Sequence, residues 1–226
     1  MQRLIAIGLN DCAIARQTGI PRRTVLDWRR FRSSIRTRGT NASHCNIAHD
    51  FAALPAGAYC YLFGLYLGDG CISRHPRAWR LRITLDDKYP GIVDRCREAI
   101  DILMPGQRAA TPRRSDNCIE VSLYSKHWPC LLPQHGTGKK HLRPIRLEPW
   151  QEGLVKEATE EFIRGLIDSD GCRVVANDSD DIRGLFIAAL DELGIPWTRS
   201  SRYVIAIYRR SRYRVSTNSS GPSLEF

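Results

Sequence analysis

Two segments of this chain carry nearly the same ten residues: LFGLYLGDGC at 62–71 and IRGLIDSDGC at 163–172. The copies lie 101 positions apart (163 minus 62), and each closes on Asp-Gly-Cys. The apolar residues in each copy have helical spacing, and glycine is a frequent left-handed stop after a helix. The repeat therefore predicts two equivalent helices that end at Asp69 and Asp170, each followed by a glycine in the left-handed conformation.

Small residues recur four apart on one face of each predicted helix: Gly64, Gly68, Gly165 and Ser169. A face without large side chains lets two helices pack backbone to backbone, so we expect these residues to form a helix interface. This packing would place Asp69 and Asp170 side by side. Two adjacent carboxylates repel each other unless a cation lies between them, and a hard divalent ion with oxygen ligands fits that role.

The charge of the chain indicates a polyanionic partner, because the formal net charge is +10 and the pI is near 9.5. Nucleic acid is favoured over a membrane, since no apolar run approaches the roughly 20 residues that span a bilayer. The apolar stretch at the N-terminus is too short for a signal peptide, so we expect a cytoplasmic, nucleoid-associated protein. A chain of 226 residues is long enough for one large domain or two small ones.

Eight cysteines raise the question of disulfides or zinc. None of them forms a CxxC pair, whereas a structural zinc site usually has two closely spaced pairs of ligands. We therefore expect reduced and mostly buried thiols. His44, Cys45 and His49 lie close together in a polar stretch, but three scattered ligands of different types are weak evidence for a metal site.

Residues 1–31 have the pattern of a helix-turn-helix DNA-binding domain. Asn10 suits an N-cap, Gly19 interrupts the first helix, and Pro21 suits the first turn of a second one. The second helix is expected to present to DNA the residues Arg22, Arg23 and Thr24. Any two short helices around a glycine turn would look similar. Charge favours DNA, because nine arginines and three aspartates in residues 1–57 give +6 of the total of +10.

The two repeated segments resemble the signature helices of LAGLIDADG homing endonucleases of the single-chain, two-motif kind, over roughly residues 58–215. The resemblance implies an α+β fold of two pseudo-symmetric αββαββ repeats, at 58–148 and 149–226, that straddles double-stranded DNA as a monomer. The small all-α helix-turn-helix domain precedes these repeats, and residues 32–57 form a basic polar linker.

The same resemblance implies a metal-dependent DNA endonuclease. Asp69 and Asp170 match the catalytic, metal-binding acids of the family, with Mg²⁺ or another divalent cation as the cofactor. The sixth motif position, Leu67 in the first copy and Asp168 in the second, is not a metal ligand in that family. Lys126 follows the segment IEVSLY, where family members often place a lysine near the cut phosphates, and is a further catalytic candidate.

The segment RLRITL at 80–85 alternates polar and apolar residues, as expected for a half-buried antiparallel strand. A helix at 89–103, a basic segment and a second alternating strand at 119–124 follow it. A polar strand face can contact DNA, although a solvated sheet face has the same pattern. The candidates for DNA contact outside the helix-turn-helix are Arg74, Arg80, Arg82, Arg113, Arg114, Lys139, Lys140 and Arg173.

The second repeat is shorter than the first. The segments AIDIL at 99–103 and ALDEL at 189–193 are offset by 90, whereas the motifs are offset by 101, so about eleven residues are missing (101 minus 90). One strand therefore has little room to form between the second motif and its helix. In the last strand, YVIAIY at 203–208, Val204 and Ala206 occupy the positions that would face the bases, so part of this DNA-binding surface is lost.

Functions of different classes fit these observations. The first is site-specific cleavage of double-stranded DNA. The second is transcriptional regulation by a protein that keeps the endonuclease fold without its chemistry, which the shortened second repeat favours. RNA-binding maturase activity also occurs in the broader family, but a DNA-type helix-turn-helix argues against it. The chain lacks the terminal residues of an intein, so we expect a free-standing protein.

Overall fold

The computed structural model describes residues 9–22, 25, 45, 48–170 and 174–207. The chain divides into two compact units, Met1–His44 and Cys45–Phe226, which we call the first and second units. No helix in the described ranges is long and apolar enough to cross a membrane.

The first unit contains helix α2 (Asp11–Thr18). The Asn10 side chain accepts a hydrogen bond from the backbone of Ala13 at 2.8 Å, and Gly19 closes the helix with a φ of 70°. These contacts confirm the predicted N-cap and glycine turn. Most of the expected second helix, with Arg23 and Thr24, lies outside the described residues, whereas the Arg22 side chain is exposed.

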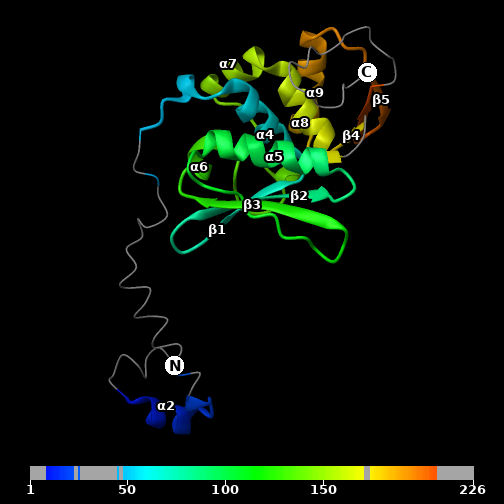
Figure 1. Cartoon of the computed structure of the whole chain (residues 1–226). Helices are drawn as coiled ribbons and strands as arrows, with labels where there is room; N and C mark the ends of the chain where they lie inside the picture. The colour runs from blue at the N-terminus through cyan, green and yellow to red at the C-terminus, as the bar shows by residue number, and fades with distance from the viewer. Residues whose placement is uncertain (1–8, 23–24, 26–44, 46–47, 171–173, 208–226) are drawn as a thin grey trace. The chain divides into compact units, whose positions relative to one another are not determined.

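The first half of the second unit is a three-stranded antiparallel sheet with helices on one face (Figure 1). Its elements are η1 (Phe51–Ala53), α4 (Ala56–Gly68), β1 (Gly70–Arg74), β2 (Trp79–Asp86), α5 (Pro90–Leu103), β3 (Cys118–Ser125) and α6 (Trp128–Leu131). The sheet order is β1-β2-β3, and α5 lies across the sheet with α4 beside it. Leu81, Ile83 and Leu85 are buried, which confirms the alternation predicted for 80–85.

The second half has fewer and shorter strands. Its elements are η2 (Lys140–Leu142), α7 (Pro149–Glu157), α8 (Thr159–Asp170), β4 (Val174–Ala176), α9 (Asp180–Glu192), β5 (Thr198–Ser201) and β6 (Val204–Ala206). They include a second antiparallel sheet, of order β4-β6-β5. Between α8 and α9 the described residues hold one strand, β4, which confirms the predicted shortage of chain.

The fold class is α+β, as predicted, but the described elements do not form two αββαββ repeats. In the first half, the expected strand before β3 is reduced to two isolated bridges, Ala110 with Ser122 and Arg113 with Ile119. In the second half, a single strand precedes α9, because the chain is too short there for a hairpin. In each half the motif helix, α4 or α8, is followed by a strand, but the two halves do not contain the same number of described strands before the next helix.

Helices α4 and α8 pack backbone to backbone through glycine. A Cβ atom on Gly64 would lie 2.6 Å from the carbonyl oxygen of Phe162, and one on Gly165 would overlap the carbonyl oxygen of Tyr61. One turn further along, a Cβ atom on Gly68 would overlap the Ser169 side chain. The small residues at these four positions therefore set the close approach of the two helices.

Gly70 differs from its predicted conformation. Helix α4 ends with Asp69 as its C-cap residue, and Gly70 begins β1 without a positive φ. Glycine is needed here for a steric reason, because a Cβ atom would lie 2.5 Å from the Cα atom of Tyr66. The prediction of a left-handed stop at Gly70 is therefore wrong, and Gly171 lies outside the described residues.

Candidate active site and nucleic-acid interface

Asp69 and Asp170 meet at one end of the α4–α8 pair. Asp69 caps α4, with its backbone N–H donating to the carbonyl of Leu65 at 3.1 Å, and Asp170 is the last residue of α8. Both aspartates line the same cavity of about 500 Å³, together with Thr84 of the first sheet and Ser169. Two helices from distant parts of the chain thus bring two carboxylates to one site.

Burial disfavours the ionisation of both carboxylates. Burial raises the pKa of Asp170 to about 6; the charge of Asp69 also raises it, while the hydrogen bond from the Ala176 N–H at 2.7 Å opposes the shift. Burial also raises the pKa of Asp69, and the positive charge of Lys140 opposes that shift. A divalent cation with oxygen ligands would offset both effects, so the pair has the donor chemistry of a Mg²⁺ site.

The raised pKa of Asp170 predicts a pH-dependent gain in stability for Asp170→Asn. Below pH 3.8 the carboxyl is neutral in both states, and wild-type stability falls as the pH rises through the folded-state pKa of about 6. Asparagine keeps an oxygen for the Ala176 N–H and cannot ionise. We expect the variant to be more stable than wild type by about 1 kcal/mol at about pH 7.5, after allowance for solvent screening.

Metal-free urea unfolding at about pH 7.5 and about pH 4.5 measures this difference. The gain should shrink at the lower pH, because Asp170 then becomes largely neutral in the folded protein. An equal effect at both pH values would show that ionisation of Asp170 does not cost stability.

Asp168, at the sixth motif position, holds the helices together. Its carboxylate accepts a hydrogen bond from the Tyr61 hydroxyl at 2.9 Å and pairs with Arg95 at 2.8 Å. The side chain is buried, and both partners occupy its Oδ2 atom. These contacts give Asp168 a structural role at the cavity that it lines together with Asp69 and Asp170.

The sequence did not predict that the Lys140 side chain lies at the C-terminal end of α4. Its Nζ atom donates to three backbone carbonyls at the end of α4, those of Tyr66, Gly68 and Gly70, the last at 2.9 Å. Burial lowers its pKa to about 8, although the charge of Asp69 favours its protonated form. Lys140 was expected to contact phosphate, but these bonds direct its charge toward the helix end and Asp69.

Lys126 is not brought to the two aspartates. It follows β3 and is exposed, whereas Cys118 at the other end of β3 lines the aspartate cavity. An eight-residue strand spans about 24 Å. The catalytic prediction for Lys126 is therefore not supported by the geometry, and Lys140 is the lysine beside the pair.

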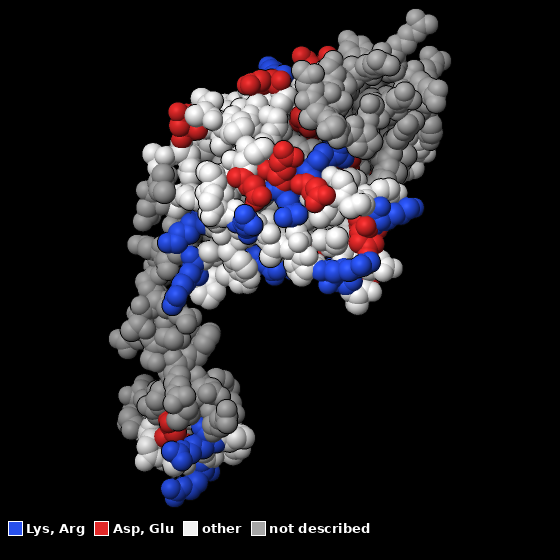
Figure 2. Space-filling view, viewed as in Figure 1, with Lys and Arg blue, Asp and Glu red and all other residues white. Residues whose placement is uncertain are grey.

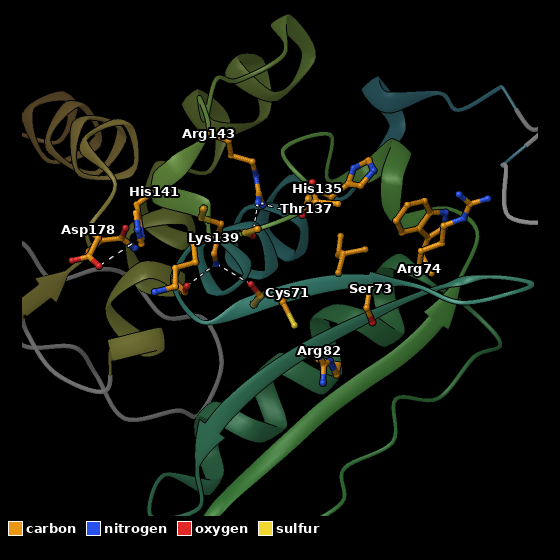
Figure 3. A pocket seen from close by; sticks show the side chains of 18 of the residues that line it. Cys71, Ser73, Arg74, Arg82, His135, Thr137, Lys139, His141, Arg143 and Asp178 are labelled. Carbon is orange, nitrogen blue, oxygen red and sulfur yellow. Dashed lines mark hydrogen bonds and ion pairs between the residues drawn. The ribbon is translucent and has the colours of Figure 1, made fainter. Parts of the chain in front are cut away.

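A basic groove of about 960 Å³ lies beside the same helix end. Gly68 and Gly70 line it next to Asp69, and basic side chains surround it. Arg74 and Arg82 of the first sheet and Lys139 and Arg143 of the loop across from it line the groove (Figure 3). Arg74, Arg82 and Lys139, which were expected to contact DNA, thus lie in one groove, and the guanidinium of Arg143 beside them donates to backbone carbonyls of its own loop.

Glu120 partly neutralises the arginines of the sheet. Arg80 pairs with Glu120 at 2.5 Å and donates to Ser122 at 3.1 Å. Arg82 and Arg114 approach the same carboxylate at 3.9 Å and 4.0 Å. The sheet therefore carries less free positive charge than its sequence pattern indicated.

The remaining DNA-contact candidates differ in their surroundings. Arg113 is exposed and pairs with Asp87, and Arg114 pairs with Asp116 at 3.1 Å. Arg173 lies outside the described residues.

Figure 2 shows acidic side chains gathered over α5, whose exposed acids include Asp94, Glu98 and Asp101. This acidic surface is unsuited to phosphate, which favours the opposite face of the sheet.

Comparisons with known proteins yield structural similarities alone. No family model matches the sequence, and no curated protein matches it. The similar solved structures include I-DmoI in complex with DNA and Ca, with 21% identity, 69% of this chain and 84% of that chain covered, and a TM-score of 0.49.

Two further structures give similar values. One, described as mesophilic variants from the homing endonuclease I-DmoI, shows 19% identity, 67% and 84% coverage, and a TM-score of 0.47. I-DmoI in complex with DNA and Mn shows 20% identity, 68% and 90% coverage, and a TM-score of 0.47. Each TM-score is below 0.5, so the function of this chain has to be inferred from its own site.

Proposed function

We propose that this protein is a LAGLIDADG-type endonuclease that cleaves double-stranded DNA at specific sites with Mg²⁺ or another divalent cation. The observation that carries the proposal is the meeting of Asp69 and Asp170 in one cavity beside a basic groove. Neither carboxylate is paired with an arginine in the described hydrogen bonds, in contrast to the neighbouring Asp168. Two acids that share a cavity, with no arginine partner among the described hydrogen bonds, are better suited to bind a cation than to form structural ion pairs.

The residues of the chain have distinct roles in this proposal. Asp69 and Asp170 hold the cation, and Lys140 adds positive charge next to Asp69. Arg74, Arg82 and Lys139 of the groove bind phosphates on either side of the reacting bond and orient it. When bound, Mg²⁺ acidifies water and stabilises negative charge on the leaving oxygen. Both acids belong to one chain, so a monomer suffices.

A cleavage experiment tests the proposal. Purified protein is incubated with a randomised library of duplex DNA in Mg²⁺ or in EDTA, and the ends produced are sequenced. We expect cuts at a defined sequence in Mg²⁺ and none in EDTA. Specific binding without cleavage in Mg²⁺ would contradict Mg²⁺-dependent endonuclease activity.

The salt dependence of DNA binding tests the basic groove. Arg74→Ala and Lys139→Ala should each reduce the slope of log K against log salt by about one, because each removes one phosphate contact. Arg97→Ala is the matched control, since Arg97 is an exposed arginine on the acidic side of α5. Fluorescence anisotropy over a salt series measures the slope. Equal slopes for all four proteins would exclude the groove as the phosphate site.

DNA-binding regulation without cleavage is a second candidate. The small second sheet favours it, because β4 and β6 have three residues each and Ile205 and Ala206 are buried. With two short, apolar strands, this sheet leaves mainly the exposed polar β5 to contact one DNA half-site. The library experiment separates the two functions, since a regulator would enrich a bound sequence without cutting it.

A further inference from the structure

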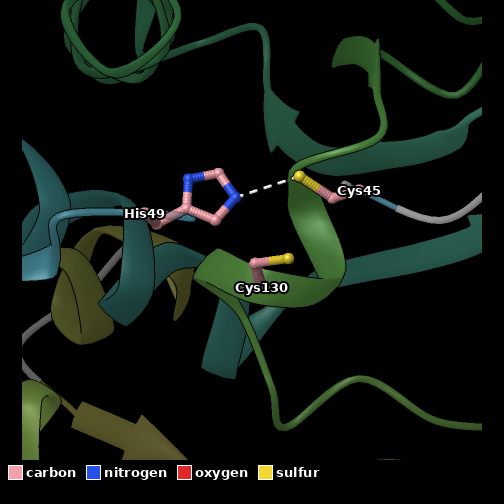
Figure 4. Close-up of side chains that lie close together, drawn as sticks. All are labelled: Cys45, His49 and Cys130. Carbon is pink, nitrogen blue, oxygen red and sulfur yellow. Dashed lines mark hydrogen bonds between the residues drawn. The ribbon is translucent and has the colours of Figure 1, made fainter. Parts of the chain in front are cut away.

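Three potential metal ligands converge where the second unit begins. Cys45 and His49 come from the segment before η1, and Cys130 comes from α6. One ligand atom from each of these residues lies within 4.8 Å of the other two. Figure 4 shows the His49 ring pointing at the Cys45 sulfur, with the Cys130 sulfur beside them.

His127 places a fourth ligand atom next to Cys45 and His49, but outside the set in which every ligand atom lies within 4.8 Å of the others. Its Nδ1 atom lies 3.2 Å from Cys45 Sγ and 3.5 Å from His49 Nε2, and His49 Nε2 lies 3.1 Å from Cys45 Sγ. The two imidazole rings meet edge to face, with centroids 5.1 Å apart. Two sulfurs and two ring nitrogens are therefore gathered from segments about 80 residues apart in the sequence.

The distances match the spacing that a zinc ion imposes on its ligands. With Zn–S of about 2.3 Å and Zn–N of about 2.0 Å, tetrahedral geometry separates sulfur from nitrogen by about 3.5 Å and two nitrogens by about 3.3 Å. The separations among Cys45, His49 and His127, 3.1 to 3.5 Å, are close to these values, and zinc binding has to bring His127 and Cys130 closer together.

The sequence spacing also fits a structural zinc site. Cys45 and His49 are four positions apart, and His127 and Cys130 are three apart. Structural zinc sites typically combine two such closely spaced pairs of Cys or His ligands. Each pair here contains one cysteine and one histidine, which is why a search for CxxC does not find it.

We propose that Cys45, His49, His127 and Cys130 bind one Zn²⁺ ion in a structural site. Two thiolates and two neutral imidazoles would neutralise the ion and satisfy its tetrahedral preference. The ion fastens the segment before η1 to α6, in the first half of the second unit. Phe51, stacked on Trp150 with ring centroids 4.1 Å apart, anchors the same segment by a separate contact.

The zinc site is separate from the aspartate pair. Tyr59, near the start of α4, donates its hydroxyl to the carbonyl of Leu131 in α6 at 2.8 Å, so the cluster lies toward the N-terminal end of α4. Asp69 caps the other end of this 13-residue helix, which is about 20 Å long. The inference therefore does not depend on DNA cleavage, and a failure of either proposal leaves the other intact.

Zinc measurement on the full chain, purified without a polyhistidine tag, tests the inference. After dialysis against zinc and then against zinc-free buffer, we expect about one Zn²⁺ per chain by plasma mass spectrometry. Cys45→Ser, Cys130→Ser and His127→Ala should each weaken zinc binding by tenfold or more. Cys118→Ser is the matched control, because Cys118 is a half-buried cysteine outside the cluster.

If a ligand variant fails to fold, the absorption spectrum of the Co²⁺-substituted wild-type protein still tests the site. A four-coordinate site with two thiolates should give sulfur-to-cobalt charge transfer and the visible bands of tetrahedral Co²⁺. Chelation should also lower the thermal midpoint. Absence of bound zinc and of this spectrum, or formation of a Cys45–Cys130 disulfide in place of metal binding, would overturn the proposal. Unchanged zinc affinity in the ligand variants would overturn it as well.

Discussion

Asp69→Asn and Asp170→Asn should each abolish Mg²⁺-dependent double-strand cleavage, with a fall in rate of about a thousandfold or more. The two carboxylates share one cavity at the ends of α4 and α8. Asparagine has almost the same shape but no negative charge, so it weakens cation binding while leaving the helix packing in place. A thousandfold loss corresponds to about 4 kcal/mol of transition-state stabilisation, which is within the range attributed to a bound metal ion.

Single-turnover cleavage of the selected duplex, together with anisotropy measurements of binding, tests this prediction. DNA binding should stay within a few-fold of wild type, because neither aspartate contributes to the basic groove. Asp101→Asn, which changes an exposed carboxylate on the outer side of α5, serves as the matched control and should cut normally. If Asp69→Asn and Asp170→Asn both cut at the wild-type rate, the aspartate pair is not the active site.

Gly165→Ala should destabilise the second unit by about 3 kcal/mol and lower its thermal midpoint by about 10 °C. The new methyl group would overlap the carbonyl oxygen of Tyr61 and lie 3.0 Å from the Cα atom of Gly64. Both are backbone atoms of α4, so α4 and α8 have to move apart. Such a movement also separates the two aspartates, and we expect cleavage to fall together with stability.

Gly184→Ala is the control for the intrinsic effect of replacing a helical glycine. Gly184 lies in α9, and nothing is within 4 Å of a Cβ atom at this position. Alanine there should stabilise the protein by about 0.5–1 kcal/mol, because glycine loses more backbone entropy on folding. Calorimetry of both variants measures their changes in stability. If Gly165→Ala also stabilises the protein, the α4–α8 interface is not tightly packed.

The zinc proposal adds a second kind of metal chemistry to the chain. Thiolate and imidazole ligands favour Zn²⁺, whereas the carboxylates of Asp69 and Asp170 favour Mg²⁺. The two sites therefore respond to different reagents. A zinc-selective chelator should lower stability without removing Mg²⁺. Omission of Mg²⁺ should stop cleavage without detaching the segment before η1 from α6.

The sequence by itself determined the leading helices of both halves and the positions of their terminal aspartates. The repeat predicted α4 and α8, the alternation at 80–85 predicted β2, and the offset of eleven residues predicted the loss of a strand before α9. These features depend on local periodicity and chain length, which a sequence displays directly. The conformation of Gly70 was mispredicted, because its constraint is steric contact with Tyr66 and not the end of a helix.

Tertiary structure alone decided which side chains surround those aspartates and where other polar groups converge. Lys140 lies 71 positions after Asp69 (140 minus 69), and Glu120 reaches arginines on β2 across the sheet. The two Cys–His pairs meet across 82 positions (127 minus 45). No local period encodes such distances. They follow from the packing of α4 on α8 and from strand register, which place distant residues together only after the chain has buried its apolar core.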